Sequence, residues 1–232
     1  VMRRMLRSLS DQYVACSRSV GDYVVARYGI TQPLSVIPWG IPLDQFRAVA
    51  PLLVVPPVRF LILGRLYPQK GQDIALRACA MVKDLPWRMD IVGDGPEREM
   101  LCALAKELGV EDRVTFHRST LDVAQVFGDH DVVLIPSRWE GLGIVAMEAM
   151  AAGRLVMASD VDGLREVVVN PEIGILVAPT VEAWAQSIRQ VLTEGIEPLR
   201  KRAALGQAHA YRHYDIREEV LAYERIYFSL CR

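Results

Sequence analysis

The sequence predicts an α/β fold built on a doubly wound parallel sheet. Short runs rich in Val, Ile and Leu lack the polar alternation of a sheet with one solvated face, which indicates strands buried on both sides. Segments with helical spacing separate these runs, and this order is typical of parallel strands joined by right-handed crossovers. The length of 232 residues suits one domain of this kind, and we predict a single domain over 1–232.

The first part of the chain is the least regular. Residues Asp11 to Cys16 lead into a helix that we predict to run to about Tyr28, and Ser35 to Pro38 form a short strand before a turn. Residues 42–57 contain four prolines and few signals of order. The regular part of the fold is therefore expected to begin near residue 58.

From residue 58 onward, predicted strands and helices alternate. Apolar runs that end in glycine predict the first two strands, helical spacing predicts the first helix, and Pro96 suits the first turn of the next one. The predicted strands are 58–64, 87–93, 113–116, 131–136, 155–159 and 174–177. The predicted helices are 71–83, 96–108, 121–127 and 143–152, followed by a helical pattern from Val181 to the end with breaks at Gly195, Pro198 and Asp215.

Composition excludes several classes of function. Lys plus Arg number 27 and Asp plus Glu number 28, so the net charge of −1 gives no general attraction for nucleic acid. No apolar run reaches the roughly 18 residues of a membrane span, and no apolar stretch of a secretory signal follows the basic N-terminus. The chain does not begin with methionine and opens in a helical pattern, so we expect a piece of a longer protein.

The cysteines indicate a reducing compartment. They are far apart, and none forms a pair with zinc-site spacing. Their apolar neighbours predict buried free thiols. The four residues are Cys16, Cys79, Cys102 and Cys231.

Three short motifs are interpreted as structural. His209 and His213 lie one helical turn apart without an obvious third ligand, which favours a solvated helix face over a metal site. Asp129-His130-Asp131 matches a metal-binding DxD pattern but joins a helix to an apolar strand, which favours a turn. Gly93-Asp94-Gly95-Pro96 lacks the third glycine of a dinucleotide loop, which argues against NAD.

Polar, glycine-rich loops follow three of the predicted strands, at 64–66, 93–96 and 137–143. Ligands of doubly wound sheets bind beyond the carboxyl ends of the strands. We therefore predict that these loops share one edge of the sheet and form the functional site.

The loop after Ile135 offers backbone amides and carboxylates. Gly141 and Gly143 precede a predicted helix, whose N-terminus favours an anion. Glu140 lies in the loop, and Glu148 lies more than one turn into an apolar helix, where a carboxylate needs hydrogen bonds. Sugar or ribose hydroxyls would supply these bonds, and two solvated charges fit the pattern equally well.

The segment GRLYPQKG, residues 64–71, is the second candidate. Arg65 offers a planar fork of donors and Lys70 a point charge, a combination suited to a diphosphate. The spacing is not that of a Walker loop. Two solvated surface cations fit this spacing at least as well.

Seven segments occur in the order known from one family. The chain resembles the C-terminal, donor-binding half of retaining GT-B glycosyltransferases of group 1 (family 4), from about Asp11 to Tyr227. The resemblance includes the E-x7-E motif, Glu140 to Glu148. The segments are VIPWGIPLDQF, LILGRLYPQKG, DIVGDGPER, RVTFHRS, DVVLIPSRWEGLGIVAMEAMAAG, ASDVDGLREVV and GILVAP.

The resemblance implies a fold and a site. The fold would be the Rossmann-like half of GT-B, with C-terminal helices at 197–232 that pack back on an N-terminal acceptor-binding domain, which we expect to be absent here. Arg65 and Lys70 would bind the diphosphate and stabilise the leaving nucleotide, and Glu148 would bind the ribose. Glu140 and the amides after it would hold the donor sugar, while the 93 loop and 114–117 would lie near the base. The implied site is Gly64, Arg65, Lys70, Gly93, His117, Glu140, Gly141, Leu142, Gly143 and Glu148, with Arg65, Lys70 and Glu140 catalytic.

The implied activity is that of a hexosyltransferase. A sugar would pass from a UDP- or GDP-sugar to a saccharide or glycolipid acceptor with retention, in cell-envelope polysaccharide or glycolipid synthesis. The departing phosphate would assist the acceptor, and no metal or other cofactor is expected because Arg and Lys stabilise the charge. The acceptor would bind through the N-terminal domain, so we expect the chain alone to be inactive. We expect no nucleic-acid partner and a cytoplasmic location, with peripheral contact at the inner face of the membrane.

Some positions depart from the family pattern. Trp39 stands where asparagine is frequent, His117-Arg118 stands near a frequent glycine, and Arg154-Leu155 stands near a frequent proline. The first two lie near the expected donor site and bear on the choice of base or sugar. The alternative functions are a noncatalytic nucleotide-sugar-binding module and a GT-B phosphorylase or epimerase. No pyridoxal-lysine motif supports a phosphorylase, and the E-x7-E motif argues against an epimerase.

Overall fold

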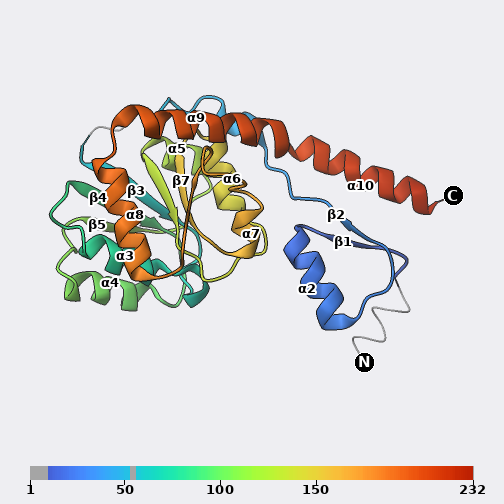
Figure 1. The fold of residues 1–232 in the computed structure, drawn as a ribbon, viewed down its shortest axis with the longest axis horizontal. Coiled ribbons are helices and arrows are strands. Elements are labelled where there is room, and N and C mark those ends of the chain that lie inside the picture. Colours follow the sequence, from blue (N-terminus) through green and yellow to red (C-terminus); the bar gives the residue numbers. More distant parts are fainter. Residues whose placement is uncertain (1–9, 53–55, 232) are drawn as a thin grey trace.

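The computed structural model describes residues 10–52 and 56–231, so the helical pattern expected before residue 10 lies outside it. Six strands form the main sheet (Figure 1). They are β3 (Val58–Leu63), β4 (Trp87–Val92), β5 (Val114–His117), β6 (Val132–Ile135), β7 (Leu155–Ser159) and β8 (Ile175–Val177). The helices of this part are η2 (Pro68–Lys70), α3 (Gln72–Ala80), α4 (Arg98–Glu107), α5 (Val123–Gly128), α6 (Ile144–Ala151), α7 (Asp162–Arg165), α8 (Val181–Thr193), α9 (Ile196–His213) and α10 (Ile216–Leu230).

The strand order of the main sheet is β5-β4-β3-β6-β7-β8, and every neighbouring pair is parallel. The predicted doubly wound parallel sheet is confirmed. The chain builds outward from β3 in one direction through β4 and β5, then returns to the other side of β3 with β6. Ligands bind at such a reversal of strand order, beyond the carboxyl ends of the strands. The fold therefore predicts a ligand site at the loops after β3 and β6.

Each face of the sheet is covered by helices. Phe60 and Ile62 of β3 join a core with α3, α4 and α8, while Leu61 between them joins a second core with α5 and α6. This alternation follows from the two-residue period of a strand. All residues of β6 and β7 are buried, as their unbroken apolar runs predict.

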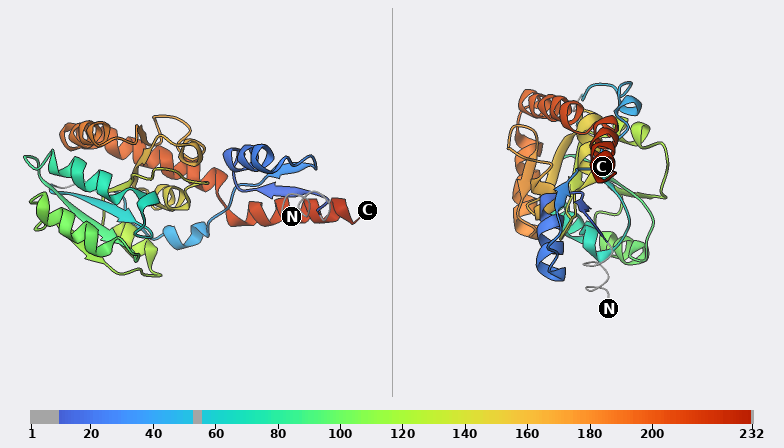
Figure 2. Two further views of the ribbon diagram at one scale, coloured as in Figure 1. Left: turned by 90° about the horizontal axis from the view of Figure 1, so that it is seen from below. Right: turned by 90° about the vertical axis from the view of Figure 1, so that its right-hand side faces the viewer.

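A second, two-stranded sheet lies apart from the main one. It consists of β1 (Tyr13–Ala15) and β2 (Leu34–Val36), which pair in parallel and are connected by α2 (Arg18–Tyr28). Figures 1 and 2 show this β1–α2–β2 unit beside α10 at one end of the molecule. The backbone N–H of Gly40 donates to the carboxylate of Glu219 at 2.7 Å, which attaches the start of α10 to the segment that follows β2.

Helix α10 differs from α9 in its burial. Leu199, Ala203 and Ala210 of α9 are buried in the cores on the two faces of the main sheet, whereas no residue of α10 is buried. Among the described residues, no helix combines the length and the apolar character that a membrane crossing requires.

Some local predictions need correction. The break predicted at Pro198 is wrong, because Pro198 lies in the first turn of α9, where no helical partner for its N–H is needed. Of the four cysteines predicted to be buried, Cys79 is buried, Cys16 is only partly buried, and Cys102 and Cys231 are exposed. Cys102 lies between the core residues Leu101 and Leu104 of α4 and therefore faces solvent. The proline-rich stretch also contains a short helix, η1 (Leu43–Phe46).

Two other sequence features are structural. Asp131 is fully buried and accepts the backbone N–H of Arg59 at 2.9 Å, which confirms the structural interpretation of the DxD motif. Arg154 is buried, and its guanidinium donates to the carbonyls of Ala50, His130 and Ala152. The departure at Arg154 thus anchors the segment that leads into β3.

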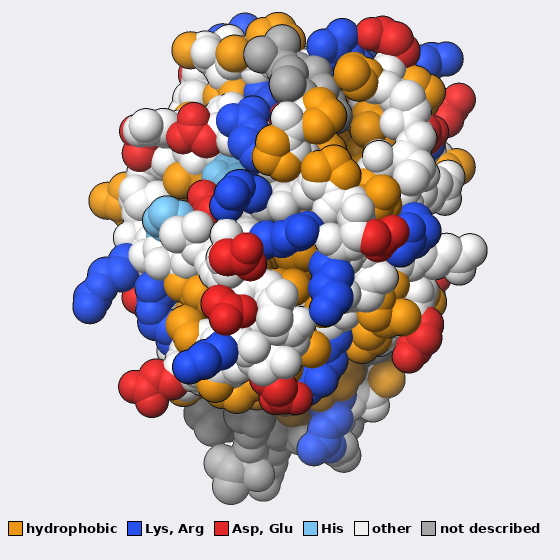
Figure 3. Space-filling model, turned by 90° about the vertical axis from the view of Figure 1, so that its left-hand side faces the viewer, with side chains coloured by type: hydrophobic (Ala, Val, Ile, Leu, Met, Phe, Trp, Pro, Cys, Tyr) orange, Lys and Arg blue, Asp and Glu red, His pale blue; other side chains and the backbone are white. Residues whose placement is uncertain are grey.

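Charges of both signs are mixed on the surface. Figure 3 shows Lys and Arg side chains interspersed with Asp and Glu over the face that it presents. This distribution accords with the net charge of −1 and contains no large area of one sign on that face.

Candidate functional site

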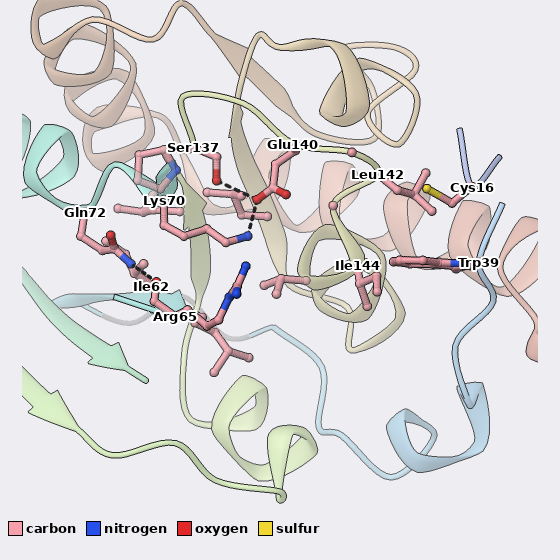
Figure 4. Close-up of a pocket in the computed structure, with 18 residues that line it drawn as sticks. Cys16, Trp39, Ile62, Arg65, Lys70, Gln72, Ser137, Glu140, Leu142 and Ile144 are labelled. Carbon is pink, nitrogen blue, oxygen red and sulfur yellow. Dashed lines mark hydrogen bonds and ion pairs between the residues drawn. The ribbon is translucent and has the colours of Figure 1, made fainter. Parts of the chain in front are cut away.

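A cavity of about 420 Å³ lies at the carboxyl ends of β3 and β6, where the strand order reverses (Figure 4). Its walls come from the loops after these strands, from the start of α6, and from the segments around β1 and β2. The lining residues are Cys16, Trp39, Ile62, Leu63, Gly64, Arg65, Lys70, Gln72, Leu134, Ile135, Pro136, Ser137, Glu140, Gly141, Leu142, Gly143, Ile144 and Val145.

Lys70 and Glu140 form an ion pair inside this cavity. The ammonium Nζ of Lys70 binds Oε1 of Glu140, and the buried hydroxyl of Ser137 donates to the same oxygen at 2.8 Å. The two charged side chains are 21% and 10% exposed, respectively, so water screens this pair only partly. Within the described residues, Oε2 of Glu140 has no partner and is available to a ligand.

The loops that carry this pair are fastened to each other. The amide of Gln69 donates to the carbonyl of Trp139 at 3.1 Å, and the N–H of Arg138 donates to the carbonyl of Gln69 at 2.8 Å. Gly71 has a φ of +65°, and a Cβ there would lie 2.0 Å from the carbonyl oxygen of Pro136. A glycine is therefore required where the two loops meet, and their charged residues lie side by side.

Arg65 presents a guanidinium without an acidic partner in the described part of the chain. It lies 5.4 Å from the ring centre of Tyr67, a cation–π contact. Figure 4 shows Arg65 and Lys70 pointing toward the carboxylate of Glu140. Gly93 approaches so closely that a Cβ would lie 1.9 Å from the carbonyl oxygen of Gly64, so the loops after β3 and β4 touch.

The N-terminus of α6 opens onto the same cavity. Its N-cap is Gly143, with a φ of +83° and no side-chain cap. Residues 142–145 have backbone N–H groups without an acceptor among the residues described. Unpaired N–H groups at a helix start, beside two cations, attract an anion.

Glu148 lies in α6 one turn beyond Ile144 and outside the cavity lining. It is half-buried, and no described side chain donates to it. Burial raises the pKa of this carboxyl to about 7. A carboxylate in this position lacks the hydrogen bonds that its charged form requires.

His117 and Gly93 also lie outside this cavity lining. Nε2 of His117 is 3.2 Å from Oδ2 of Asp90, which His130 approaches at the same distance. These side chains line a second hollow of about 420 Å³ beside α5. No group of three or more possible metal ligands is present in the described residues.

The structure brings seven of the ten predicted site residues into one cavity. They are Gly64, Arg65, Lys70, Glu140, Gly141, Leu142 and Gly143. Sequence reasoning missed Ser137 and Gln72, both fully buried polar residues of the lining. Ser137 stands three positions before Glu140, and this spacing is the one signal that could have indicated it.

Comparison with protein families gives a direct match. The family model “Glycosyl transferases group 1” matches residues 51–209. D-inositol 3-phosphate glycosyltransferase of Segniliparus rotundus is 35% identical over 222 residues, which cover 88% of this chain and 49% of that protein. The enzyme of the same name from Mycobacterium sp. (strain KMS) is 38% identical over 149 residues, which cover 60% of this chain and 33% of that protein. The chain thus spans about half the length of such relatives or less.

Solved structures share the fold. Sucrose-phosphate synthase from Thermosynechococcus elongatus superposes with a TM-score of 0.85 at 26% identity and covers 99% of this chain and 60% of that one. Anabaena HepE in complex with UDP-glucose has a TM-score of 0.85 at 22% identity, covering 97% and 66%. The C-terminal domain of a group 1 glycosyl transferase (LpcC) from Francisella tularensis has a TM-score of 0.66 at 22% identity, covering 76% and 100%.

Proposed function

The chain belongs to the group 1 glycosyltransferases, and from this premise we propose that its cavity binds the diphosphate and sugar of a nucleotide-sugar donor. One observation carries the proposal. Two cations, the uncapped start of α6 and a carboxylate with an open oxygen face a single cavity at the reversal of strand order. A diphosphate linked to a hydroxyl-rich sugar needs this combination of donors and acceptors.

Each charged group has a part in this proposal. The guanidinium of Arg65 and the N–H groups of residues 142–145 bind the phosphate oxygens. Lys70 places a second positive charge near the leaving phosphate while it pairs with Oε1 of Glu140. The open Oε2 of Glu140 accepts a hydrogen bond from a sugar hydroxyl.

We propose that the nucleoside extends from this cavity along the start of α6 and the loops after β4 and β5. Glu148 then accepts hydrogen bonds from the ribose hydroxyls, and the loops of Gly93 and His117 lie near the base. The raised pKa of Glu148 supports this assignment, because hydroxyl donors would stabilise its charged form.

The proposed reaction is retaining transfer. The bond between the sugar's anomeric carbon and the phosphate oxygen breaks, and the acceptor hydroxyl forms a new bond to that carbon on the same face. The acceptor's proton passes to the departing phosphate, so the products are a glycoside and a nucleoside diphosphate. Arg65 and Lys70 stabilise the charge that develops on the phosphate, the part that a metal ion takes in other enzymes.

The acceptor is proposed as a saccharide or a lipid-linked sugar that binds through a second domain of the full-length protein, at the cytoplasmic face of the membrane. Inositol 3-phosphate belongs in the acceptor panel because relatives carry it in their names. UDP-glucose belongs in the donor panel because HepE of the same fold was solved with it.

Ligand-observed NMR and calorimetry test the donor site. The panel holds UDP, GDP, ADP and their sugar conjugates, with and without EDTA. We expect one nucleotide to bind selectively and without effect of EDTA. Arg65→Ala should weaken binding by about tenfold or more, as expected for a lost charged hydrogen bond.

The matched control is Arg77→Ala, which removes an exposed arginine of α3 that does not line the cavity. This variant should bind like the original chain. Binding of no nucleotide, or equal binding by the Arg65 and Arg77 variants, would overturn the proposed site.

A further inference from the structure

The start of α2 is held by an acidic side chain that directly follows α7. Oε2 of Glu166 accepts the backbone N–H of Arg18 at 2.8 Å, and Oε1 accepts that of Ser19 at 2.9 Å. A helix leaves these first N–H groups without partners of its own. Burial alone would raise the pKa of Glu166, but these hydrogen bonds hold it below its usual value. Glu166 therefore clamps the β1–α2–β2 unit from the end of α7.

Ser17 connects the start of α2 to the wall of the cavity. Its fully buried hydroxyl caps α2 by accepting the N–H of Val20 at 3.2 Å and donates to the carbonyl of Gly141 at 2.6 Å. Gly141 lines the cavity. One hydroxyl thus joins the N-terminus of α2 to the loop before α6.

The opposite side of this loop is fixed by α7. A Cβ on Gly163 would lie 2.5 Å from the carbonyl oxygen of Glu140 and 2.6 Å from the carbonyl carbon of Gly141. A Cβ on Gly143 would lie 2.6 Å from the side chain of Leu164 in α7. The loop is therefore held between α2 and α7, and Glu166 at the end of α7 binds α2 in turn.

The bond from Ser17 determines the direction of one amide. In a trans peptide the carbonyl and the following N–H point in opposite directions. With the carbonyl of Gly141 turned to Ser17, the N–H of Leu142 points away from α2. That N–H is one of those without an acceptor in the described structure.

We propose that Ser17 and Glu166 are positioning residues for the peptide between Gly141 and Leu142, so that the placement of the β1–α2–β2 unit controls how tightly the cavity binds a diphosphate. The inference rests on the proposed donor site and adds its coupling to the second sheet. Linkage makes the coupling reciprocal, so a bound diphosphate stabilises the contact of α2 with the loop.

The experiment uses the full chain and two probes, UDP and inorganic pyrophosphate. Pyrophosphate tests the diphosphate-binding part of the cavity without a contribution from a nucleobase. Ser17→Ala should weaken binding of both by about three- to tenfold, the equivalent of one hydrogen bond. It should also shift the amide ¹⁵N resonance of Leu142 in the free protein. Glu166→Gln leaves Ser17 in place and should change both readouts in the same direction by a smaller amount.

Thr180→Ala is the matched control, since Thr180 caps α8 through the N–H of Ala183 and lies outside the cavity lining. It should lower the thermal stability like Ser17→Ala, while the probe affinities and the Leu142 resonance stay unchanged. If Ser17→Ala and Glu166→Gln bind both probes like the original chain while Arg65→Ala loses binding, the inference is wrong and the donor site stands. If the original chain binds neither pyrophosphate nor any nucleotide, both fail.

Discussion

Glu140 and Glu148 are both glutamates and lie only eight positions apart, one in the loop before α6 and the other within α6. Their carboxylates differ in the hydrogen-bond donors and the positive charge that surround them. Glu140 has the ammonium of Lys70 and the hydroxyl of Ser137 on one oxygen. Glu148 has no donor among the described residues, and burial raises its pKa to about 7. The protein itself supplies partners to one oxygen of the first carboxylate and to neither oxygen of the second.

The difference shows at which carboxylate a ligand's hydrogen bonds contribute the larger favourable free energy. Hydrogen bonds from a ligand to Glu140 add to a group that is already stabilised. Hydrogen bonds to Glu148 remove an unfavourable free energy that the folded protein carries without the ligand. A carboxylate whose burial costs stability is retained more readily at a binding site than elsewhere.

The largest effect is expected at Glu140, the carboxylate that has partners within the protein. Lys70→Ala leaves the nearly buried carboxylate of Glu140 without its counter-charge and should destabilise the protein by about 3 to 5 kcal/mol in urea unfolding at pH 8. Adding Glu140→Gln should restore most of this loss, because the unpaired charge is then gone.

The control for this prediction is Lys83→Ala, which removes an exposed lysine of the same charge. It should change stability by less than about 0.5 kcal/mol. A Lys70 variant as stable as the Lys83 variant would show that Glu140 does not depend on the ion pair for its stability in the fold.

Glu148→Gln should act in the opposite sense. The folded protein holds the proton of Glu148 more tightly than the unfolded chain, so the contribution of Glu148 to stability is fully present below pH 4.5 and is lost as pH rises through about 7. The variant should be more stable than the original chain by about 2 to 3 kcal/mol at pH 8 and equally stable at pH 4. Urea unfolding at both pH values measures this. A constant difference between the two proteins would mean that Glu148 ionises freely.

Most of the fold could be predicted from the sequence, and the site only in part. Unbroken apolar runs predict β6 and β7 because both faces of those strands are covered. The loops after β3 and β6 could be placed together because parallel strands end at one edge. Residue spacing alone left the two glutamates as ligand-binding or solvated, since the covering of a side chain depends on elements far away in the sequence. Ser137 and Gln72 were not predicted as residues of the site for the same reason.

The pH dependence of UDP binding tests the ionisation of Glu148 directly. If ribose hydroxyls donate to ionised Glu148, binding expels a proton from it, and UDP affinity should rise by about tenfold from pH 6 to pH 8 through this group. Calorimetry on the original chain and on Glu148→Gln separates this contribution from the titration of UDP itself. Parallel pH profiles for the two proteins would remove Glu148 from the proposed ribose site.

The smallest effect concerns the second partner of Glu140. Ser137→Ala removes a fully buried hydroxyl that donates to Oε1 at 2.8 Å, and it should cost about 1 kcal/mol. Ser159 at the end of β7 is a matched control, because it is also fully buried but its hydroxyl has no partner in the described structure. Ser159→Ala should therefore be neutral or stabilising, since it removes an unsatisfied polar group.

The expected difference between the two serine variants comes from the hydrogen-bond partner of Ser137 rather than from burial, and a double-mutant cycle separates these two contributions. In a Glu140→Ala background the hydroxyl of Ser137 has lost its acceptor, so Ser137→Ala should cost about 1 kcal/mol less there than in the original chain. The cost of Ser159→Ala should not depend on Glu140. An equal cost of Ser137→Ala in both backgrounds would mean that the hydroxyl stabilises the loop without acting on Glu140, and that Lys70 alone satisfies this carboxylate.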